Sequence, residues 1–322
     1  MTSFTLLALL IATSSAVGVI ADAINPLAAS TVRQEMVHSN RRAKRSLDHI
    51  VKDCVMVASE EGHYYYKTTS LEEPTTCGVF LLTDADKLIE IYFDYIDLPC
   101  EGGGLISFFD GWELNGQFFP SNEDHPKPMS QRFAEFCGIR KNKQIFVSAQ
   151  NAALVQYRVP QRGRGFSFIV RFKKNPKPCN ILIEGTADVY TLRNYGKHVN
   201  CSLTTLYPAH VKVLSLGVGL SFSKRTVGME VETGTLHKCD KRGLEDFVQL
   251  GGGDGLDLAQ LSVVDSICGM NSSPDRQVET ILCGVTTVRM VSSGEFDNSV
   301  TVAVAQADIM EDMNRASLVC GL

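Results

Sequence analysis

Cysteines are the residues of this chain whose number and spacing carry the most chemistry. Ten cysteines stand among 322 residues, an even number that allows complete pairing and that is unusual in a reducing cytosol. The nearest two, Cys268 and Cys283, are fifteen positions apart, a spacing that suits disulfides better than a zinc knuckle. We therefore expect a secreted, extracellular protein held by disulfides.

Motifs for catalysis are missing from the sequence. It contains no His-Glu-x-x-His, no Gly-x-Ser-x-Gly, no glycine loop followed by Lys-Ser/Thr and no Cys-x-x-Cys. We interpret His125 as a turn or surface residue rather than a base, and residues 251–255 as a β-turn. A net charge of −5 provides no positive field for nucleic acid. The sequence predicts neither an enzyme nor a protein that binds a cofactor or nucleic acid.

The first 53 residues carry targeting and processing signals. Residues 4–20 are uncharged and mostly apolar, and Ala21-Asp22-Ala23 has a small-x-small cleavage pattern. Residues 1–23 are therefore interpreted as a signal peptide, with an N-terminal membrane anchor as the alternative; once the signal is removed we expect no membrane association. Residues 24–53 are interpreted as a leader or linker, in which Arg42-x-Lys44-Arg45 predicts either cleavage after Arg45 or a solvated charge run.

Short strands, rather than helices, must position the cysteines. Apolar residues alternate with polar ones over residues 89–95 and 166–172, the period of a strand with one buried face. Helix signals are confined to residues 129–137 and to a short amphipathic stretch over residues 308–319. A hydrophobic fraction of 44% over 322 residues is typical of a globular chain of two domains. We expect an all-β, largely antiparallel fold.

A charged, proline-containing stretch over residues 173–178 predicts the domain boundary. Four cysteines precede it and six follow, so each side can pair internally, although the sequence alone leaves the pairing open. We expect a first module over residues 54–174, a second over residues 179–305 and a tail over residues 306–322.

Both halves resemble CUB modules, which are jelly-roll sandwiches of two sheets. The first half carries the pattern Leu88-x-Glu90-x-Tyr92-Phe93, and the second carries Asp246-Phe247-Val248-x-Leu250 and Ile267-Cys268-Gly269. A longer signature is similar to the corticotropin-releasing factor (CRF)-binding protein family, and we expect an invertebrate member; it includes Phe109-Asp110-Gly111-Trp112, Phe136-Cys137 and Val288-Arg289-Met290-Val291-Ser292-Ser293-Gly294. The resemblance runs from about Cys54 to Leu322 and leaves out the leader.

The resemblance implies two CUB-like jelly-roll β-sandwich modules in tandem, stapled by five sequential disulfides. These are Cys54 with Cys77, Cys100 with Cys137, Cys179 with Cys201, Cys239 with Cys268, and Cys283 with Cys320. The last bridge would tie the tail back to the second module. Each closes a loop for which chain entropy gives about 3–4 kcal/mol.

The resemblance also implies a function and a partner. A secreted protein of this kind would sequester a CRF-like peptide hormone, in arthropods a CRF-like diuretic peptide, and would limit activation of its receptor. Such peptides are long amphipathic helices, so we expect an apolar groove on one sandwich or between the two modules. The alternative is a CUB-domain adaptor that docks other secreted proteins or proteinases; a secreted hydrolase comes third.

Four further residues have roles that the sequence suggests. Many CUB modules hold calcium with carboxylates, but the first half has Glu101 followed by glycines where an aspartate is expected, so no metal is predicted there; Asp246 leaves a weak site open in the second half. The sequon at Asn200 predicts N-glycosylation, whereas Pro274 disfavours the sequon at Asn271. Trp112 is interpreted as buried core, with a peptide anchor as the alternative.

Overall fold

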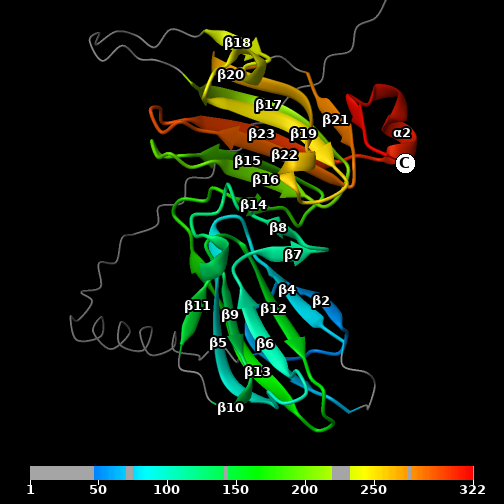
Figure 1. The fold of residues 1–322 in the computed structure, drawn as a ribbon. Coiled ribbons are helices and arrows are strands. Elements are labelled where there is room, and N and C mark those ends of the chain that lie inside the picture. The colour runs from blue at the N-terminus through cyan, green and yellow to red at the C-terminus, as the bar shows by residue number, and fades with distance from the viewer. Residues whose placement is uncertain (1–46, 70–74, 141–143, 220–232, 275–276, 322) are drawn as a thin grey trace, which may run out of the picture. The chain divides into compact units, whose positions relative to one another are not determined.

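The computed structural model describes residues 47–69, 75–140, 144–219, 233–274 and 277–321. Residues 46–322 cluster into one compact unit. The predicted signal peptide and the predicted cleavage site at Arg45 lie outside the described residues. In Figure 1 the strands of a first sandwich run from blue to green and those of a second from green to red.

The first sandwich consists of two sheets. One has the order β1-β3-β13-β5-β10, with β11 also paired to β5: β1 (Asp48–Ile50), β3 (Gly62–Lys67), β13 (Gly165–Lys174), β5 (Lys87–Leu98), β10 (Gly138–Arg140) and β11 (Ile145–Val147). The other has the order β2-β4-β12-β6-β9: β2 (Val55–Ala58), β4 (Cys77–Leu82), β12 (Ala152–Arg158), β6 (Leu105–Phe109) and β9 (Phe133–Phe136). A separate hairpin joins β7 (Trp112–Leu114) to β8 (Gln117–Phe119), and a 3₁₀ turn, η1 (Met129–Gln131), precedes β9.

The second sandwich is built from one continuous sheet that folds over itself. Its main path is β14 (Ile181–Leu182), β16 (Cys201–Thr205), β22 (Val285–Val291), β19 (Phe247–Gly253), β20 (Ser262–Asn271), β17 (Ala209–Val218), β21 (Glu279–Leu282) and β24 (Leu318–Val319). β23 (Ser299–Gln306) joins β17 to β15 (Ala187–Arg193), and β18 (Gly234–His237) pairs with β20. Strand β20 passes from one layer to the other, because its first half pairs with β19 and its last three residues pair with β17.

Helical structure is confined to short pieces. The described residues contain the α-helix α2 (Ile309–Asp312) and, besides η1, the 3₁₀ turns η2 (Asp240–Arg242), η3 (Leu258–Gln260) and η4 (Met313–Arg315). The helix predicted over residues 308–319 is therefore wrong in length. Its C-terminal part is extended, because the backbone N–H groups of Ser317 and Cys320 donate to the carbonyls of Thr280 and Leu282 beside β21.

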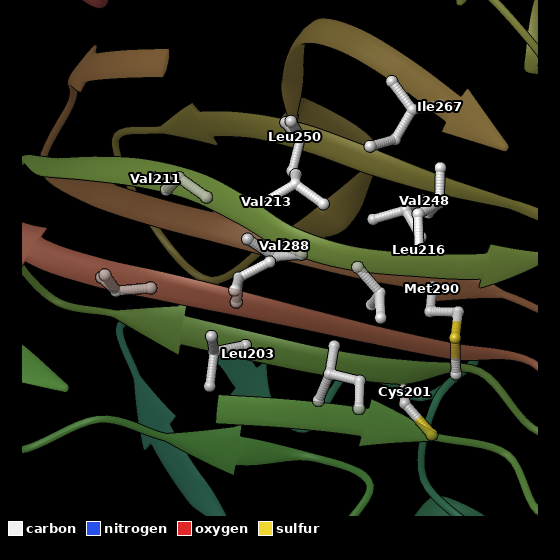
Figure 2. Close-up of a cluster of buried hydrophobic side chains, with 14 of the residues drawn as sticks. Cys201, Leu203, Val211, Val213, Leu216, Val248, Leu250, Ile267, Val288 and Met290 are labelled. Carbon is white, nitrogen blue, oxygen red and sulfur yellow. The ribbon is translucent and has the colours of Figure 1, made fainter. Parts of the chain in front are cut away.

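Each sandwich has its own apolar core. In the first, the inward residues of β5 and β13 are almost fully buried, as the period-two pattern predicts: Ile89, Ile91, Phe93, Phe166, Phe168 and Val170. Figure 2 shows the core of the second, where Val213, Leu250 and Ile267 come from three different strands, β17, β19 and β20. The prediction of an all-β chain of two sandwiches stapled by disulfides is confirmed.

Five disulfides join the same pairs that the family resemblance implied: Cys54 with Cys77, Cys100 with Cys137, Cys179 with Cys201, Cys239 with Cys268, and Cys283 with Cys320. No described cysteine is free. The chain therefore has the covalent framework of a protein from an oxidising compartment.

Two local expectations differ from the structure. Strand β1 lies within residues 24–53, which the sequence pattern assigned to a leader, and it pairs in parallel with β3. Of residues 251–255, predicted as a β-turn, the first three end strand β19 and pair with β22, and the chain bends only from Asp254 onward. A Cβ at Gly252 would come within 2.6 Å of the Ile281 side chain. Glycine is required there by the close approach of β21 rather than by a turn.

Candidate functional site

Four large apolar side chains stand in solvent where the first sandwich begins. Leu47, Ile50, Val55 and Val57 are 58%, 50%, 69% and 57% exposed, and we call them the apolar edge. They flank a shallow depression of about 620 Å³ that residues 48–50, 52–53 and 55–57 line. Contiguous exposed apolar surface is typical of interaction sites.

Strands β1 and β2 position the apolar edge, because each is the outermost strand of its sheet. β1 pairs in parallel with β3 and β2 with β4, and within the described residues neither has a second strand neighbour. The disulfide between Cys54 and Cys77 fixes the chain between the two strands, where Val51 is buried. The two edge strands are thus separated by only a short connection in the sequence, and the Cys54–Cys77 disulfide fixes that connection.

The N-terminal entry to this edge is also held. The Leu47 carbonyl accepts a hydrogen bond of 2.8 Å from the His63 backbone N–H, and a Cβ at Gly62 would lie only 2.4 Å from that carbonyl oxygen. The His49 ring stacks on Tyr64 with centroids 4.5 Å apart. Burial, together with the nearby charge of Glu60, raises the pKa of Tyr64 to about 12, so its hydroxyl remains a donor to the Glu60 carbonyl. The edge is a preformed surface, since buried contacts hold the strands that present it.

A second feature is the seam between the two sandwiches, where a third apolar cluster lies. Phe80, Phe109, Trp112 and Phe119 are among its residues from the first sandwich, and Leu182, Leu256 and Val285 come from the second. Trp112 is 4% exposed and donates its indole N–H to the Leu81 carbonyl at 2.8 Å. Trp112 is thus a buried core residue, which is the interpretation preferred from the sequence over a peptide anchor.

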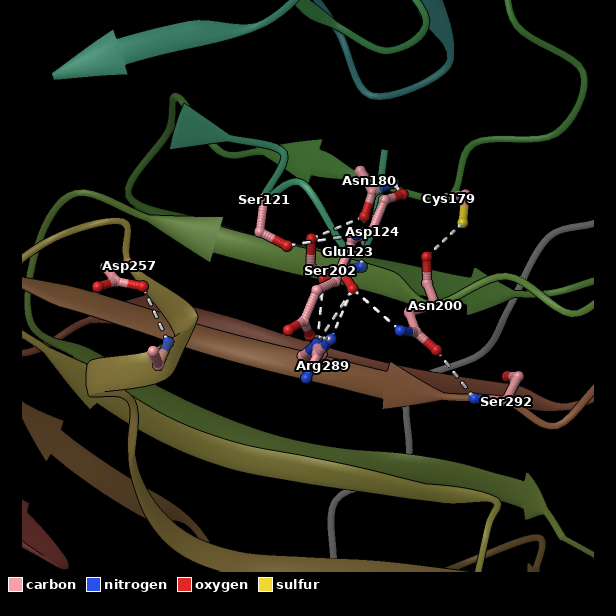
Figure 3. Close-up of polar contacts among 11 residues, drawn as sticks. Ser121, Glu123, Asp124, Cys179, Asn180, Asn200, Ser202, Asp257, Arg289 and Ser292 are labelled. Atoms are coloured by element: carbon pink, nitrogen blue, oxygen red, sulfur yellow. Dashed lines mark hydrogen bonds and ion pairs between the residues drawn. The ribbon is translucent and has the colours of Figure 1, made fainter. Parts of the chain in front are cut away.

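A buried ion pair closes the polar side of the seam (Figure 3). The Asp124 side chain is 0% exposed, and the Arg289 guanidinium donates to it from Nε at 3.1 Å and from Nη2 at 2.7 Å. Nη2 also reaches Glu123 at 2.9 Å. Burial by itself would lower the pKa of Arg289, but its hydrogen bonds and charge attraction to Asp124 and Glu123 raise it overall. The seam therefore contains a guanidinium that stays charged.

His125, beside this ion pair, is 7% exposed and not a surface residue. Its Nδ1 accepts from the Lys127 backbone N–H at 3.0 Å, which directs Nε2 toward Asp110 at 3.5 Å. Of the two positions that the sequence suggested, the turn holds, because the His125 backbone N–H donates to the Ser121 carbonyl, and the surface position is wrong. Residues 123–126 face the second sandwich, where the Asp124 carbonyl accepts from Asn180 Nδ2 at 3.0 Å.

Asp246, the candidate calcium ligand, is fully engaged by hydrogen-bond donors. Its carboxylate accepts from Asn298 Nδ2 at 2.5 Å, from Ser293 Oγ at 2.6 Å and from the Ser293 backbone N–H at 3.0 Å. Within the described residues no group of three or more His, Cys, Asp or Glu side chains is arranged to hold a metal. The amide of Asn298 and the hydroxyl and backbone N–H of Ser293 thus occupy the carboxylate oxygens that a cation would need.

The two sequons lie in different surroundings. Asn200 is half-buried at the seam, where its Nδ2 donates to Asp124 Oδ1 at 3.1 Å and its Oδ1 accepts from the Ser292 backbone N–H at 3.2 Å. Asn271 ends β20 and is followed by the exposed residues Ser272 and Ser273. The structure thus gives the predicted glycosylation site a defined polar environment.

No sequence motif pointed to a role for the apolar edge or for Arg289. The alternation Val55-x-Val57 directly after Cys54 is a strand signal that marks the edge, although nothing in it distinguishes an edge strand from an inner one. Of the predicted site residues, the structure brings Asn200 next to Asp124 and places it away from the edge strands. Among the described residues, no helix is both long and apolar enough for a membrane span.

Comparisons with known proteins match both halves of the chain. Residues 41–175 match the model of the corticotropin-releasing factor binding protein N-terminal domain, and residues 181–313 match that of the C-terminal domain. The first match begins upstream of Cys54, so the prediction that the family likeness starts near Cys54 is wrong; strand β1 belongs to the matched region.

Whole-chain relatives agree. The chain is 32% identical over 275 residues to the corticotropin-releasing factor-binding protein of Homo sapiens, covering 84% of this chain and 78% of that protein. It is 32% identical over 256 residues to that of Xenopus laevis, covering 79% and 76%. Among solved structures, the CUB1-EGF-CUB2 domains of rat MASP-1 align over 79% of this chain and 100% of that one, at 10% identity and a TM-score of 0.25. The chain belongs to the corticotropin-releasing factor-binding protein family, a family of binding proteins and not of enzymes, as the missing catalytic motifs predicted.

Proposed function

We propose that this chain is a secreted binding protein that captures a CRF-like peptide hormone and so lowers the concentration that reaches the receptor. In an arthropod the ligand would be a CRF-like diuretic peptide. The observation that carries the proposal is the match of both halves to the CRF-binding protein family. Ten cysteines in five disulfides support secretion, and the signal peptide over residues 1–23 and cleavage after Arg45 remain part of the proposal.

The apolar edge is the surface to which we assign the peptide. An amphipathic helix presents apolar anchors at i, i+3, i+4 and i+7, and it needs an exposed apolar strip on its partner. Leu47, Ile50, Val55 and Val57 supply such a strip, whereas the aromatic residues of the seam are already buried. Asp48, Lys52 and Asp53 stand at the rim of the depression and can pair with charges that flank the apolar face of a helix.

The contribution of the edge to affinity can be estimated from its exposure. A fully buried valine side chain contributes about 1.5–3 kcal/mol. More than half of Val55 and of Val57 remains exposed in the free protein, so each has roughly 1 kcal/mol left to gain on binding. Replacing both by glutamate removes this gain and adds charge to the interface, which lowers affinity at least about 30-fold.

Isothermal titration of the secreted protein with a CRF-like peptide tests the proposal, with an unrelated amphipathic helix as the control ligand. We expect the wild type to bind only the CRF-like peptide, and V55E/V57E to bind it at least about 30-fold more weakly. M310E is the matched control variant, because Met310 is 88% exposed and lies in α2 of the second sandwich. Equal binding of both peptides would overturn the function, whereas equal loss in M310E would overturn the assigned surface.

The alternative function, a CUB-domain adaptor, predicts that binding depends on calcium. CUB adaptors dock their partners through a calcium-held loop, and the Asp246 carboxylate here is occupied by protein donors instead. Peptide binding that persists in excess EDTA supports hormone capture. Binding that disappears in EDTA and returns with calcium would favour the adaptor.

A further inference from the structure

A pocket of about 410 Å³ opens on the polar side of the seam, and Asn200 lines it. The first sandwich contributes residues 123–126 and Gln150, and the remaining walls come from residues 177–180 and 193–200. The sequon residue that would carry a glycan thus faces a cavity walled by both sandwiches. Neither the family match nor the proposed hormone capture assigns a role to this cavity.

The walls of the pocket present groups that suit a neutral, hydroxylated ligand. Gln150 is 7% exposed; its Oε1 accepts from the Cys179 backbone N–H at 3.5 Å, while no described residue bonds its Nε2. This Nε2 is not a buried orphan; it is a donor that solvent in the pocket reaches, and a ligand oxygen could replace that solvent. Lys177 and Lys197 also line the pocket, and no ion pair to a described residue engages either. These donors point to a ligand rich in oxygen acceptors.

A rigid turn forms the opposite wall. Tyr195 has a φ of 54° and lies in the left-handed region. The Asn194 side chain holds the turn, because its Oδ1 accepts from the Gly196 N–H at 3.1 Å and its Nδ2 donates to the Lys197 carbonyl at 3.1 Å. The Tyr195 ring is covered by cations, since Lys177 Nζ lies 5.0 Å and the Arg193 guanidinium carbon 5.2 Å from its centroid. This wall therefore offers a sugar polar donors rather than a free aromatic face.

The chemistry of Asn200 permits a sugar without loss of its seam contacts. A carboxamide nitrogen has two N–H groups, and only one is needed for the 3.1 Å bond to Asp124 Oδ1. N-glycosylation breaks the bond between C1 of N-acetylglucosamine and the diphosphate of a lipid-linked oligosaccharide. It forms the Nδ2–C1 bond, and one amide proton is released. The second N–H and the Oδ1 acceptor remain available to Asp124 and to the Ser292 backbone.

The folded sequon cannot be modified, which sets the order of events. Cys201 is 0% exposed and bonded to Cys179, and Ser202 is 2% exposed with its hydroxyl donating to Asn180 Oδ1 at 2.7 Å. A transferase must therefore act before this disulfide and the seam form. The two sandwiches then close around a sugar that is already attached.

We propose that an N-linked glycan on Asn200 packs its first sugar residues into this pocket and becomes part of the contact between the two sandwiches. The sugar oxygens accept hydrogen bonds from Gln150 on one side and from Lys197 on the other. The glycan is then a structural component of the seam rather than a solvated surface modification.

The test compares the release of two glycans from one molecule. The full chain is secreted from cells that make only high-mannose glycans, in the variant P274A, which relieves the disfavoured sequon and adds an exposed reference glycan on Asn271. Endoglycosidase H is applied to folded and to reduced, unfolded protein, and site occupancy is followed by mass spectrometry. We expect the Asn200 glycan to be released at least tenfold more slowly from the folded than from the unfolded protein, and the Asn271 glycan at similar rates from both.

A second measurement needs no substitution. Wild-type protein made without glycans in a bacterial periplasm is compared with the secreted, glycosylated protein by calorimetry, and we expect the Tm of the unglycosylated chain to be lower by at least about 3 °C. An unoccupied Asn200, release from the folded protein as fast as at Asn271, or equal Tm values would each overturn the proposal.

Discussion

Replacing Arg289 by alanine removes the cation that neutralises Asp124 in the seam. The Asp124 side chain is 0% exposed and that of Arg289 only 12% exposed, so water replaces the lost contacts poorly. After the change, Asn200 Nδ2 is the one side-chain donor left to the carboxylate among the described residues. An acid in this position is left largely desolvated without a counter-ion.

The size of the effect follows from burial. Breaking a buried ion pair by removing one partner costs about 3–5 kcal/mol. For a chain of this size each kcal/mol lowers Tm by about 2–4 °C, so R289A should unfold roughly 6–20 °C below the wild type. R193A is the matched control. Arg193 makes a bidentate ion pair with Asp297, but the two side chains are 48% and 47% exposed. An exposed pair contributes about 0–1 kcal/mol.

Differential scanning calorimetry at neutral pH measures the difference, and a double variant isolates its cause. D124N/R289M removes the acid together with the cation, so no unpaired charge remains and most of the lost Tm should return. Equal Tm values for R289A and R193A would refute the reasoning. A double variant that is less stable than R289A would show that the contacts of Asp124 with Asn180 and Asn200 matter more than its charge.

Three more outcomes follow from the polar and covalent contacts. Burial alone would raise the pKa of Asp110, but hydrogen bonds from His125 and Lys127 lower it overall. The ionised carboxylate therefore stabilises the fold above the unfolded pKa of about 3.9, and this stabilisation is lost as pH falls through the lower folded pKa. D110N should flatten the pH dependence of the urea midpoint below about pH 4. C283S/C320S should expose the tail to trypsin within η4 while the first sandwich stays folded. The disulfide contributes about 4 kcal/mol, and the two backbone hydrogen bonds to β21 that remain cannot compensate for its loss. A tail as resistant to trypsin as that of the wild type would show that packing alone holds it. Excess EDTA should shift Tm by less than about 1 °C, and a drop of many degrees would reveal a cation held outside the hydrogen-bonded carboxylate of the second sandwich.

The strands could be predicted wherever one face of the sheet is buried. The alternation over residues 89–95 and 166–172 marks β5 and β13 because their inward side chains are excluded from water. Strand β1 could not be predicted in this way, because it is three residues long and largely exposed. Its pairing with β3 and the buried Val51 that follows it hold it in place. A pairing of this kind leaves no alternation of apolar and polar residues in the sequence.

The seam could not be predicted for a related reason. Asp124 and Arg289 are 165 positions apart, and each stands in a stretch that reads as an ordinary turn or strand. Their contact depends on how two separately folded sandwiches meet. The tail shows the same limit: residues 308–319 have the pattern of an amphipathic helix, yet backbone bonds to β21 and the bridge to Cys283 hold its end extended.

The apolar cluster of the seam has a consequence for how this protein can be divided. Phe80, Trp112 and Phe119 are buried partly against Leu256 and Val285 of the other half. A fragment that ends after β13 would place these rings in water, in addition to the already exposed residues of the apolar edge. Such a fragment would associate with itself, and the other half would lose the cover of Leu256 and Val285. The two halves therefore depend on each other for cover, and cutting the chain between them exposes apolar surface on both.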